Sequence, residues 1–172
     1  MSKIIKNHEI IEETWTLLKL NEGESAHTVA LPEEAHLIVP FSVWQARRDV
    51  LAKRPQLGVW INGYDEPEAL AEDLAYFALI AINFPIFTDG RGYSSAALLR
   101  TRYHYTGELR AIGDVLQDQL FYMKRCGFDA YALRADKNIE AALKSLTDFT
   151  EVYQTSTDQP LPLYRRYLRS SL

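Results

Sequence analysis

A short segment in the middle of the chain combines residue types from which proteins build small anion sites. Its residues are Thr88, Asp89, Gly90, Arg91, Gly92, Tyr93 and Ser94. Arg91 carries a planar fork of hydrogen-bond donors, and Ser94 stands where a helix is expected to begin, with free backbone N–H groups that attract anions. Gly90 and Gly92 allow a ligand to approach the backbone closely. The segment predicts an anion or phosphate loop, and the alternative is a tight turn in which Asp89 pairs with Arg91.

Two further charged residues, Arg110 and Asp114, complete this candidate anion site. Arg110 lies in an apolar stretch, which predicts contact either with a ligand or with a carboxylate such as Glu108. Asp114 and Asp118 lie one helical turn apart, a spacing that suits acid–base chemistry and also suits stabilisation of a helix start. If the site is catalytic, Asp89 or Asp114 would act as the acid or base.

Other chemistries lack the residues they require. The histidines His8, His27, His36 and His104 have no spacing typical of a metal site, and Cys126 has no second cysteine. Cys126 is expected at a helix C-terminus, which raises the pKa of a thiol, so we interpret it as a packed structural residue. The sequence has no Gly-x-Ser-x-Gly elbow, dinucleotide fingerprint or phosphate-binding lysine loop. We expect no metal and no cofactor.

Short apolar runs alternate with amphipathic segments from about Leu37 onward, a pattern typical of parallel strands joined by helices. Strands are expected at 36–39, 57–61, 82–87, 108–112 and 129–133. Helices are expected at 42–54, 65–77, 94–103, 113–127 and 138–149. Residues 151–154 are a candidate sixth strand.

Successive strand–helix units of this kind predict an α/β fold with a mostly parallel sheet. About five units are too few for the closed barrel of eight. The sheet is therefore either open and doubly wound, which is our first expectation, or part of a barrel-like array. In both cases the loops after the strands share one edge, where such folds bind ligands. Besides the candidate site, that edge would carry Asn62, Tyr64, Gly113, Arg134 and Asp136.

The two ends of the chain differ from this 37–154 core. Residues 1–36 are expected to form a strand or hairpin extension, in which 9–18 either pairs with 28–31 or forms a short helix. Residues 155–172 form a tail rich in proline, arginine and tyrosine. Three interpretations of the tail stay open: a flexible segment, a partner-binding segment, or a segment lying on the protein's own surface.

The composition is that of an ordinary globular chain. Of 172 residues, 47% are hydrophobic and 24% charged, with 19 Lys+Arg against 23 Asp+Glu and a net charge of -4. This mild acidity favours neither nucleic acid nor an anionic membrane as a partner. No run approaches the ~20 apolar residues of a transmembrane helix, and the first residues lack the apolar core of a signal peptide. A lone cysteine suits a reducing compartment, so we expect a cytoplasmic protein.

Several of these motifs together resemble a bacterial family, the domain of unknown function 934. The resemblance covers about Pro40 to Arg134, and its motifs are DEPEALAEDL at 65–74, FPIFTDGRGYS at 84–94, GELRA at 107–111, GDVL at 113–116 and RCGFDA at 125–130. The family has no established reaction. Its members are commonly labelled probable oxidoreductases of sulfite reduction, because their genes lie beside those for assimilatory sulfite reductase.

Two functional hypotheses follow, and whether the protein is an enzyme stays open. The resemblance implies an accessory protein of assimilatory sulfite reduction that binds the reductase or its electron donor. The polar strand ends support the alternative, a small-molecule enzyme or sensor with an anion site at that edge. A third interpretation is a scaffold in which the loop glycines serve folding only, Gly90 and Gly92 adopting positive φ.

Overall fold

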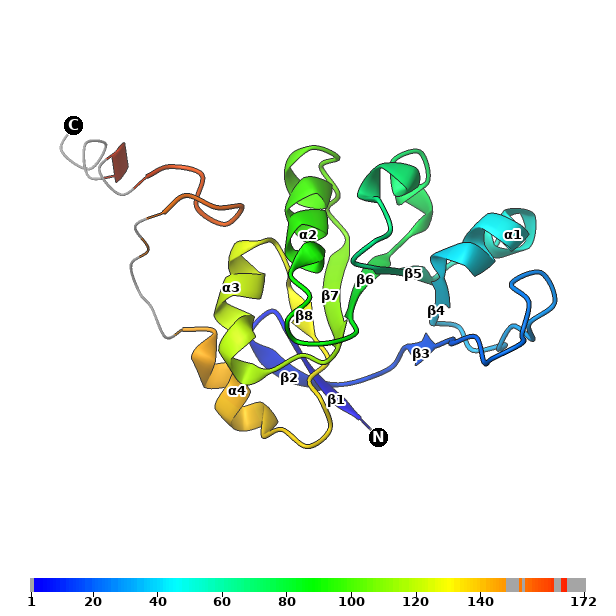
Figure 1. The fold of residues 1–172 in the computed structure, drawn as a ribbon, viewed down its shortest axis with the longest axis horizontal. Coiled ribbons are helices and arrows are strands. Elements are labelled where there is room, and N and C mark those ends of the chain that lie inside the picture. Colours follow the sequence, from blue (N-terminus) through cyan, green and yellow to red (C-terminus); the bar gives the residue numbers. More distant parts are fainter. Residues whose placement is uncertain (1, 148–151, 153, 163–164, 167–172) are drawn as a thin grey trace.

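The apolar runs that the sequence marks as strands enter one sheet. The computed structural model describes residues 2–147, 152, 154–162 and 165–166. Within them the strands are β1 (Lys3–Lys6), β2 (Glu9–Glu12), β3 (Thr16–Leu17), β4 (Leu37–Pro40), β5 (Leu57–Asn62), β6 (Leu79–Phe84), β7 (Glu108–Gly113) and β8 (Ala130–Tyr131). Their order is β2-β1-β8-β7-β6-β5-β4-β3. Neighbours from β3 to β8 are parallel, and the β1–β2 hairpin is antiparallel at one edge (Figure 1).

Strands β4 to β8 lie in the sheet in the order in which the chain makes them. Each connection therefore steps in the same direction, and because parallel crossovers are right-handed, the connecting segments collect on one face. A doubly wound sheet requires a reversal of direction, and the order β4-β5-β6-β7-β8 contains none. The mostly parallel sheet is confirmed, and it is curled into a half-barrel, the second of the two expected arrangements.

The helices differ more than the strands from the expected pattern. They are α1 (Phe41–Leu51), α2 (Arg91–Thr101), α3 (Leu120–Arg125) and α4 (Ile139–Ser145). The helix expected at 65–77 is replaced by two short 3-10 helices, Pro67–Leu70 and Leu74–Tyr76. Asp65, the expected helix-starting residue, explains the difference. Its carboxylate accepts a hydrogen bond from the Asn62 backbone N–H at 2.7 Å and so closes a turn onto the end of β5.

Two more boundaries move for local reasons, and α2 begins at Arg91, three residues before the expected start at Ser94. The strand expected at 82–87 is β6, which ends at Phe84 because Pro85 has no N–H to give to the sheet. The helix expected from 113 begins only at Leu120, after a 3-10 turn at Gln117–Gln119. Two residues of the candidate strand at 151–154, and the last two of the helix expected at 138–149, lie outside the described residues.

The two faces of the half-barrel are packed differently. On the face that carries the helices, side chains such as Val59, Ile80 and Leu109 belong to the main hydrophobic core. The alternate residues of the same strands point to the inner face, where Ile38, Leu79, Ala81 and Ile112 form a smaller buried cluster. The inner face is thus also apolar, and something must cover it.

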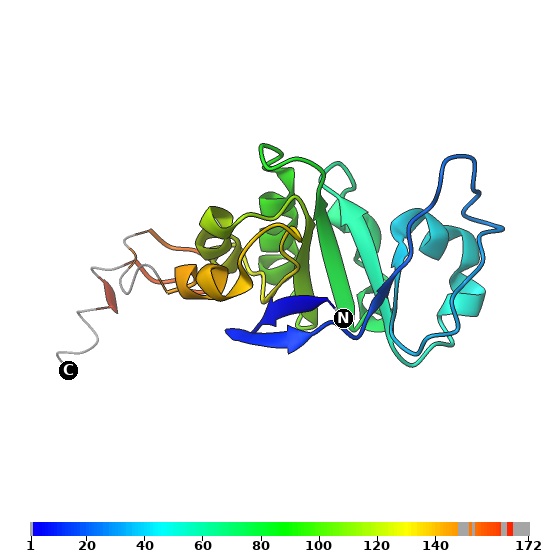
Figure 2. The same cartoon turned by 90° about the horizontal axis from the view of Figure 1, so that it is seen from below.

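A segment after the N-terminal hairpin provides that cover. The hairpin pairs β2 with β1, so both expectations for 9–18, pairing with 28–31 and a short helix, are wrong. Asn7 and His8 both have positive φ, the backbone shape that a tight two-residue hairpin turn requires. Residues 13–20, which we call the strap, then cross the inner face to β4. Trp15 and Leu17 of the strap pack on the inner cluster (Figure 2 shows the hairpin and strap in blue beside the sheet).

Part of the C-terminal tail lies on the protein's own surface. The backbone carbonyl of Arg125, at the end of α3, accepts hydrogen bonds from the hydroxyl groups of Ser156 and Thr157. The Arg125 guanidinium donates to the Gln154 carbonyl and lies 3.5 Å from the Asp158 carboxylate. These contacts fix residues 154–158 against α3.

Candidate functional site

A cavity of about 530 Å³ lies at the carboxyl ends of β4 to β7, on the inner side of the half-barrel. Its lining residues are Leu17, Lys19, Leu20, Pro40, Phe41, Ser42, Gln45, Trp60, Asn62, Tyr64, Asp65, Asn83 and Ile112. The volume is within the range of small-molecule sites, about 300–1,000 Å³. The position is the one at which barrel-like α/β folds bind their ligands.

One wall of the cavity is a chain of hydrogen-bonded uncharged groups. The Asn83 side-chain N–H donates to Asn62 Oδ1 at 2.9 Å, and the Asn62 side-chain N–H donates to Tyr64 Oη at 2.8 Å. The two asparagines are direct partners in the parallel register of β5 and β6, which places their side chains on the same face. We call the side chains of Asn83, Asn62 and Tyr64 the relay. Asn83 Oδ1, one N–H of each amide and the phenolic hydrogen of Tyr64 have no partner among the described residues.

A second wall comes from the first turn of α1 and from the strap. Ser42 and Gln45 are exposed, and Lys19 reaches the same space from the strap. None of these three side chains has a hydrogen bond or ion pair with another described residue. No side chain caps the start of α1, and its first turn carries no acidic residue. This wall therefore offers donors that are free to bind.

The floor of the cavity is apolar. Trp60 of β5 lines it together with Ile112, and the Trp60 indole N–H is engaged by the Leu18 carbonyl at 2.9 Å. Only the carbon surface of the ring is left for the cavity. The same hydrogen bond fixes the strap against β5, so the strap is a wall of the cavity as well as a cover of the inner face.

The predicted anion loop lies at the same edge, but its charged groups are already paired. Arg91 donates from Nε and Nη2 to the two carboxylate oxygens of Asp89, at 2.9 and 2.7 Å. The Arg91 backbone N–H, at the start of α2, also donates to Asp89. The guanidinium holds the pKa of Asp89 at about 2. Asp89 thus occupies the place where an external anion would bind, as in the tight-turn alternative.

The loop glycines do not have the backbone shape proposed for them. Gly90 has φ -82° and Gly92 lies inside α2, so the expectation of positive φ is wrong for both. A Cβ on Gly92 would lie 2.8 Å from the ring of Phe84, whereas a Cβ on Gly90 would meet only the Tyr93 ring, at 4.0 Å. Gly92 is required for packing of α2 on β6, and Gly90 has no such role.

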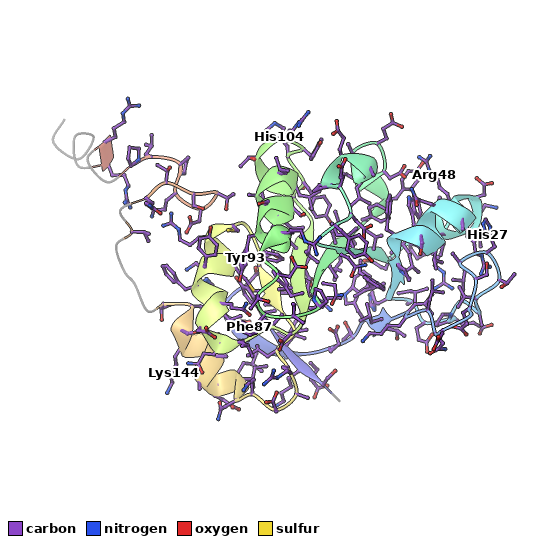
Figure 3. All side chains as sticks on the ribbon, viewed as in Figure 1. His27, Arg48, Phe87, Tyr93, His104 and Lys144 are labelled. Carbon is purple, nitrogen blue, oxygen red and sulfur yellow. The ribbon has the colours of Figure 1, made fainter. Side chains whose placement is uncertain are left out.

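Tyr93 and Phe87 belong to the outer side of this edge. The Tyr93 ring lies 5.0 Å from that of Tyr122, and Figure 3 labels Tyr93 and Phe87 near α2 and α3. Thr88 and Ser94 are exposed. None of the residues from Thr88 to Ser94 lines the cavity. The two regions meet where Arg91 lies over the Tyr64 ring, with Cζ 5.9 Å from the ring centroid.

Arg110 does not join Arg91 in one site. It is 2% exposed on the inner face, where it pairs with Glu108 at 2.6 Å and with Glu13 of the strap. Lys6 adds a further ion pair to Glu108 at 2.7 Å. Of the two interpretations offered for Arg110, the ion pair with a neighbouring carboxylate is the one observed. This buried network connects β1, β7 and the strap.

Asp114 acts as a connector between strand-end loops. One carboxylate oxygen accepts from the Phe87 backbone N–H at 3.1 Å, and the other accepts from Arg134 at 2.9 Å. Arg134 also donates to both oxygens of Asp136, which lowers the pKa of that carboxyl. Asp118 is exposed and does not contact Asp114. The polar residues after β6, β7 and β8 thus bind one another.

The remaining candidate groups are packed or scattered. Cys126 is buried, and burial raises the pKa of its thiol, which favours the neutral form. His27 lies beside α1 and His104 at the far end of α2 (Figure 3). Among the described residues no group of three His, Cys, Asp or Glu side chains could hold a metal ion. No described helix has the length and apolar character needed to cross a membrane.

The sequence analysis named Asn62 and Tyr64 at this edge but missed the cavity itself. Asn83, Gln45 and Lys19 have no predicted role, and Ser42 and Asp65 were expected only to start helices, although all five line the cavity. The sequence does contain a signal for Asn83. Two neighbouring parallel strands, LGVWIN at 57–62 and LIAINF at 79–84, each carry an asparagine after an apolar run. A polar side chain repeated near the carboxyl ends of adjacent strands indicates a common site.

Comparisons with known proteins identify the family and nothing beyond it. The model of the family described as "Bacterial protein of unknown function (DUF934)" matches residues 58–164. This range contains β6 to β8, all of β5 but its first residue, and the cavity residues Asn62, Tyr64 and Asn83. No curated protein and no solved structure matches the chain. The family match spans more than half of the chain, as the sequence motifs predict. The chain belongs to the DUF934 family of bacterial proteins of unknown function.

Proposed function

We propose that this protein binds a small molecule in the cavity at the carboxyl ends of β4 to β7. The observation that carries the proposal is the presence of unpaired polar groups in a cavity of about 530 Å³ at this edge. Half-buried polar side chains such as Asn62 and Asn83 normally have all their hydrogen bonds satisfied, so their spare donors and acceptor in a cavity indicate a ligand. The proposal concerns binding, and the acid–base roles considered for Asp89 and Asp114 have no support in their contacts.

Ligand-induced stabilisation tests this proposal, with a matched pair of variants. Ser42 and Ser94 are both exposed serines in the first turns of α1 and α2, but only Ser42 lines the cavity. A ligand at a hundred times its Kd stabilises the fold by about 2.7 kcal/mol. We expect Ser42→Trp to abolish the increase in Tm that a binding compound produces, and Ser94→Trp to preserve it. The opposite result would place the ligand at the loop from Thr88 to Ser94 and refute the proposal.

The role in assimilatory sulfite reduction, and a cytoplasmic location with it, stay predictions. A specific observation favours a protein partner as a second candidate function. Ile86, Phe87 and Tyr122 are exposed by 57%, 56% and 58%, and Gln119 donates to the Phe87 carbonyl one helical turn before Tyr122. Large exposed apolar side chains of this kind are typical of interfaces. Affinity capture with the wild-type protein and with Phe87→Ser would test it: a sulfite reductase subunit or its electron donor should bind only the former.

A further inference from the structure

The cavity lining contains features that restrict the chemistry of its ligand. This step rests on the proposed function, since it concerns the occupant of the same cavity. The lining carries one cation, Lys19, and one carboxylate, Asp65. Asp65 is held by the Asn62 backbone N–H, and no other charged side chain lines the space. The lining therefore has no net charge, unlike the clusters of arginine and lysine that bind multiply charged anions.

The free hydrogen-bonding groups of the relay include both donors and an acceptor. Asn83 Oδ1 can only accept, whereas the spare N–H groups of Asn62 and Asn83 can only donate. The Tyr64 oxygen already accepts from Asn62, so its hydroxyl hydrogen is left to donate. A ligand that satisfies this wall must itself accept and donate at adjacent positions. A hydroxyl group does both, whereas a carboxylate or sulfate offers acceptors alone and would leave Asn83 Oδ1 unpaired or repelled.

The floor adds a requirement for an apolar surface. Trp60 presents carbon surface because its N–H is bound to Leu18, and Ile112 lies beside it. A ring whose edge carries hydroxyl groups and whose face carries C–H groups matches a polar wall next to an aromatic floor. A linear anion matches neither of these two surfaces, although the uncapped start of α1 and Lys19 offer it donors on the other wall. The volume of about 530 Å³ accommodates one or two such rings.

We infer that the ligand is an uncharged ring compound bearing adjacent hydroxyl groups, of the sugar or cyclitol class. Its hydroxyl groups bind the relay of Asn83, Asn62 and Tyr64, and its C–H face lies on Trp60. Lys19 and Gln45 close the outer side of the site. Such a ring can occur free or as the ribose of a nucleoside, and the two sources share the chemistry that this wall recognises.

Titration of the wild-type protein with matched neutral and charged compounds tests the inference. The neutral probes are methyl α-glucoside, myo-inositol and D-ribose, with adenosine as the nucleoside arm. The charged probes are glucose 6-phosphate, gluconate, sulfite and sulfate. Binding is followed by tryptophan fluorescence and calorimetry. We expect at least one neutral ring to bind with a Kd about tenfold or more below that of every charged probe, and ribose against adenosine then distinguishes the two sources.

The other outcomes separate this inference from the proposed function. If a charged probe binds most tightly and Ser42→Trp abolishes its binding, the cavity is a binding site but the inference on ligand class is wrong. If no probe of either group binds the wild-type protein, the neutral-ring inference is refuted. The proposed function is then tested separately, by screening a chemically broad library for compounds whose effect on Tm requires an unblocked cavity.

A pair of conservative variants tests the relay itself. Tyr64 and Tyr76 are both exposed and both lie under an arginine, with Cζ 5.9 and 5.6 Å from the ring centroids, but only Tyr64 lines the cavity. Removing one hydroxyl by Tyr64→Phe should raise the Kd of the neutral ring by about three- to tenfold. Tyr76→Phe should leave it unchanged. An equal effect of the two variants, or none from Tyr64→Phe, overturns the assignment of the relay.

Discussion

The half-barrel carries two polar regions at one edge, the cavity and the loop from Thr88 to Ser94, and they differ in chemistry. In the cavity, the relay of Asn83, Asn62 and Tyr64 has free donors and an acceptor without a partner among the described residues. In the loop, Asp89 and Arg91 bind each other through two hydrogen bonds. The loop has more charge, but the cavity has more capacity to bind. Unpaired groups that line a cavity indicate a site better than charge or glycine content does.

The largest expected loss of stability concerns Arg110, which the sequence analysis assigns to the same candidate anion site as the loop. Arg110→Met leaves the Glu13 carboxylate without its ion-pair partner and the Glu108 carboxylate with Lys6 alone. Breaking a buried ion pair in this way costs about 3–5 kcal/mol, so urea denaturation should show a loss of that order. Adding Glu108→Gln and Glu13→Gln to the same chain should recover part of it. A loss no greater than that of an exposed arginine would contradict the structural role.

The next effect separates the two glycines of the loop. Gly92→Ala places a Cβ against the buried ring of Phe84 and should cost about 1–3 kcal/mol of unfolding free energy. Gly90→Ala meets open space at a negative φ and should be neutral or stabilising by up to about 1 kcal/mol. Thermal denaturation of both variants measures the difference. Equal losses of unfolding free energy in the two variants would indicate that both glycines are needed for the backbone shape of the loop.

Arg91→Ala is expected to change ligand binding very little, because Arg91 does not line the cavity. The Arg91 side chain is 59% exposed and its partner Asp89 is 9% exposed, so loss of the pair affects the turn from Asp89 to Arg91 and leaves the cavity lining in place. The compounds that raise the Tm of the wild-type protein should raise that of Arg91→Ala by the same amount. A selective loss of binding in Arg91→Ala, with Ser42→Trp unaffected, would move the site from the cavity to the loop.

The smallest effect is the titration of Asp89. Its pKa is lowered from 3.8 to about 2 by the hydrogen bonds from Arg91. The ion pair therefore contributes to stability above the unfolded-state pKa, and that contribution is lost as the pH falls through about 2. Carboxyl-carbon NMR should show a midpoint near 2 in the wild-type protein and a return toward 3.8 in Arg91→Ala. The same midpoint in both proteins would refute the pairing.

The parallel strands were predictable because their signal is local. Runs such as Leu57–Asn62 are apolar and short, and proline or glycine residues punctuate them. Sheet order was not predictable in the same way. Doubly wound and barrel-like arrangements share one strand–helix pattern and differ only in the direction of each crossover. The hairpin partner of β2 was missed because Lys3–Lys6 is only two isoleucines between two lysines, too short a segment to show a strand period.

The candidate site was predicted less well than the fold, and for a physical reason. The loop from Thr88 to Ser94 has a contiguous motif, whereas the cavity is assembled from the strap, α1 and the ends of four strands. Spacing along the chain carries no information on such an assembly. Whether Arg91 is free depends on the side-chain direction of Asp89, two residues away. The Asn62–Asn83 pair was the one part that register could have revealed.

The central claim is that ligand occupies the cavity and not the loop. Amide NMR of the wild-type protein, titrated with a compound that raises its Tm, tests it most directly. We predict shifts of the side-chain amide signals of Asn62 and Asn83 and of the Lys19 backbone amide, with the Gly90 and Gly92 amides unchanged. Shifts confined to the amides between Thr88 and Ser94, with both asparagine side chains unaffected, would contradict the account.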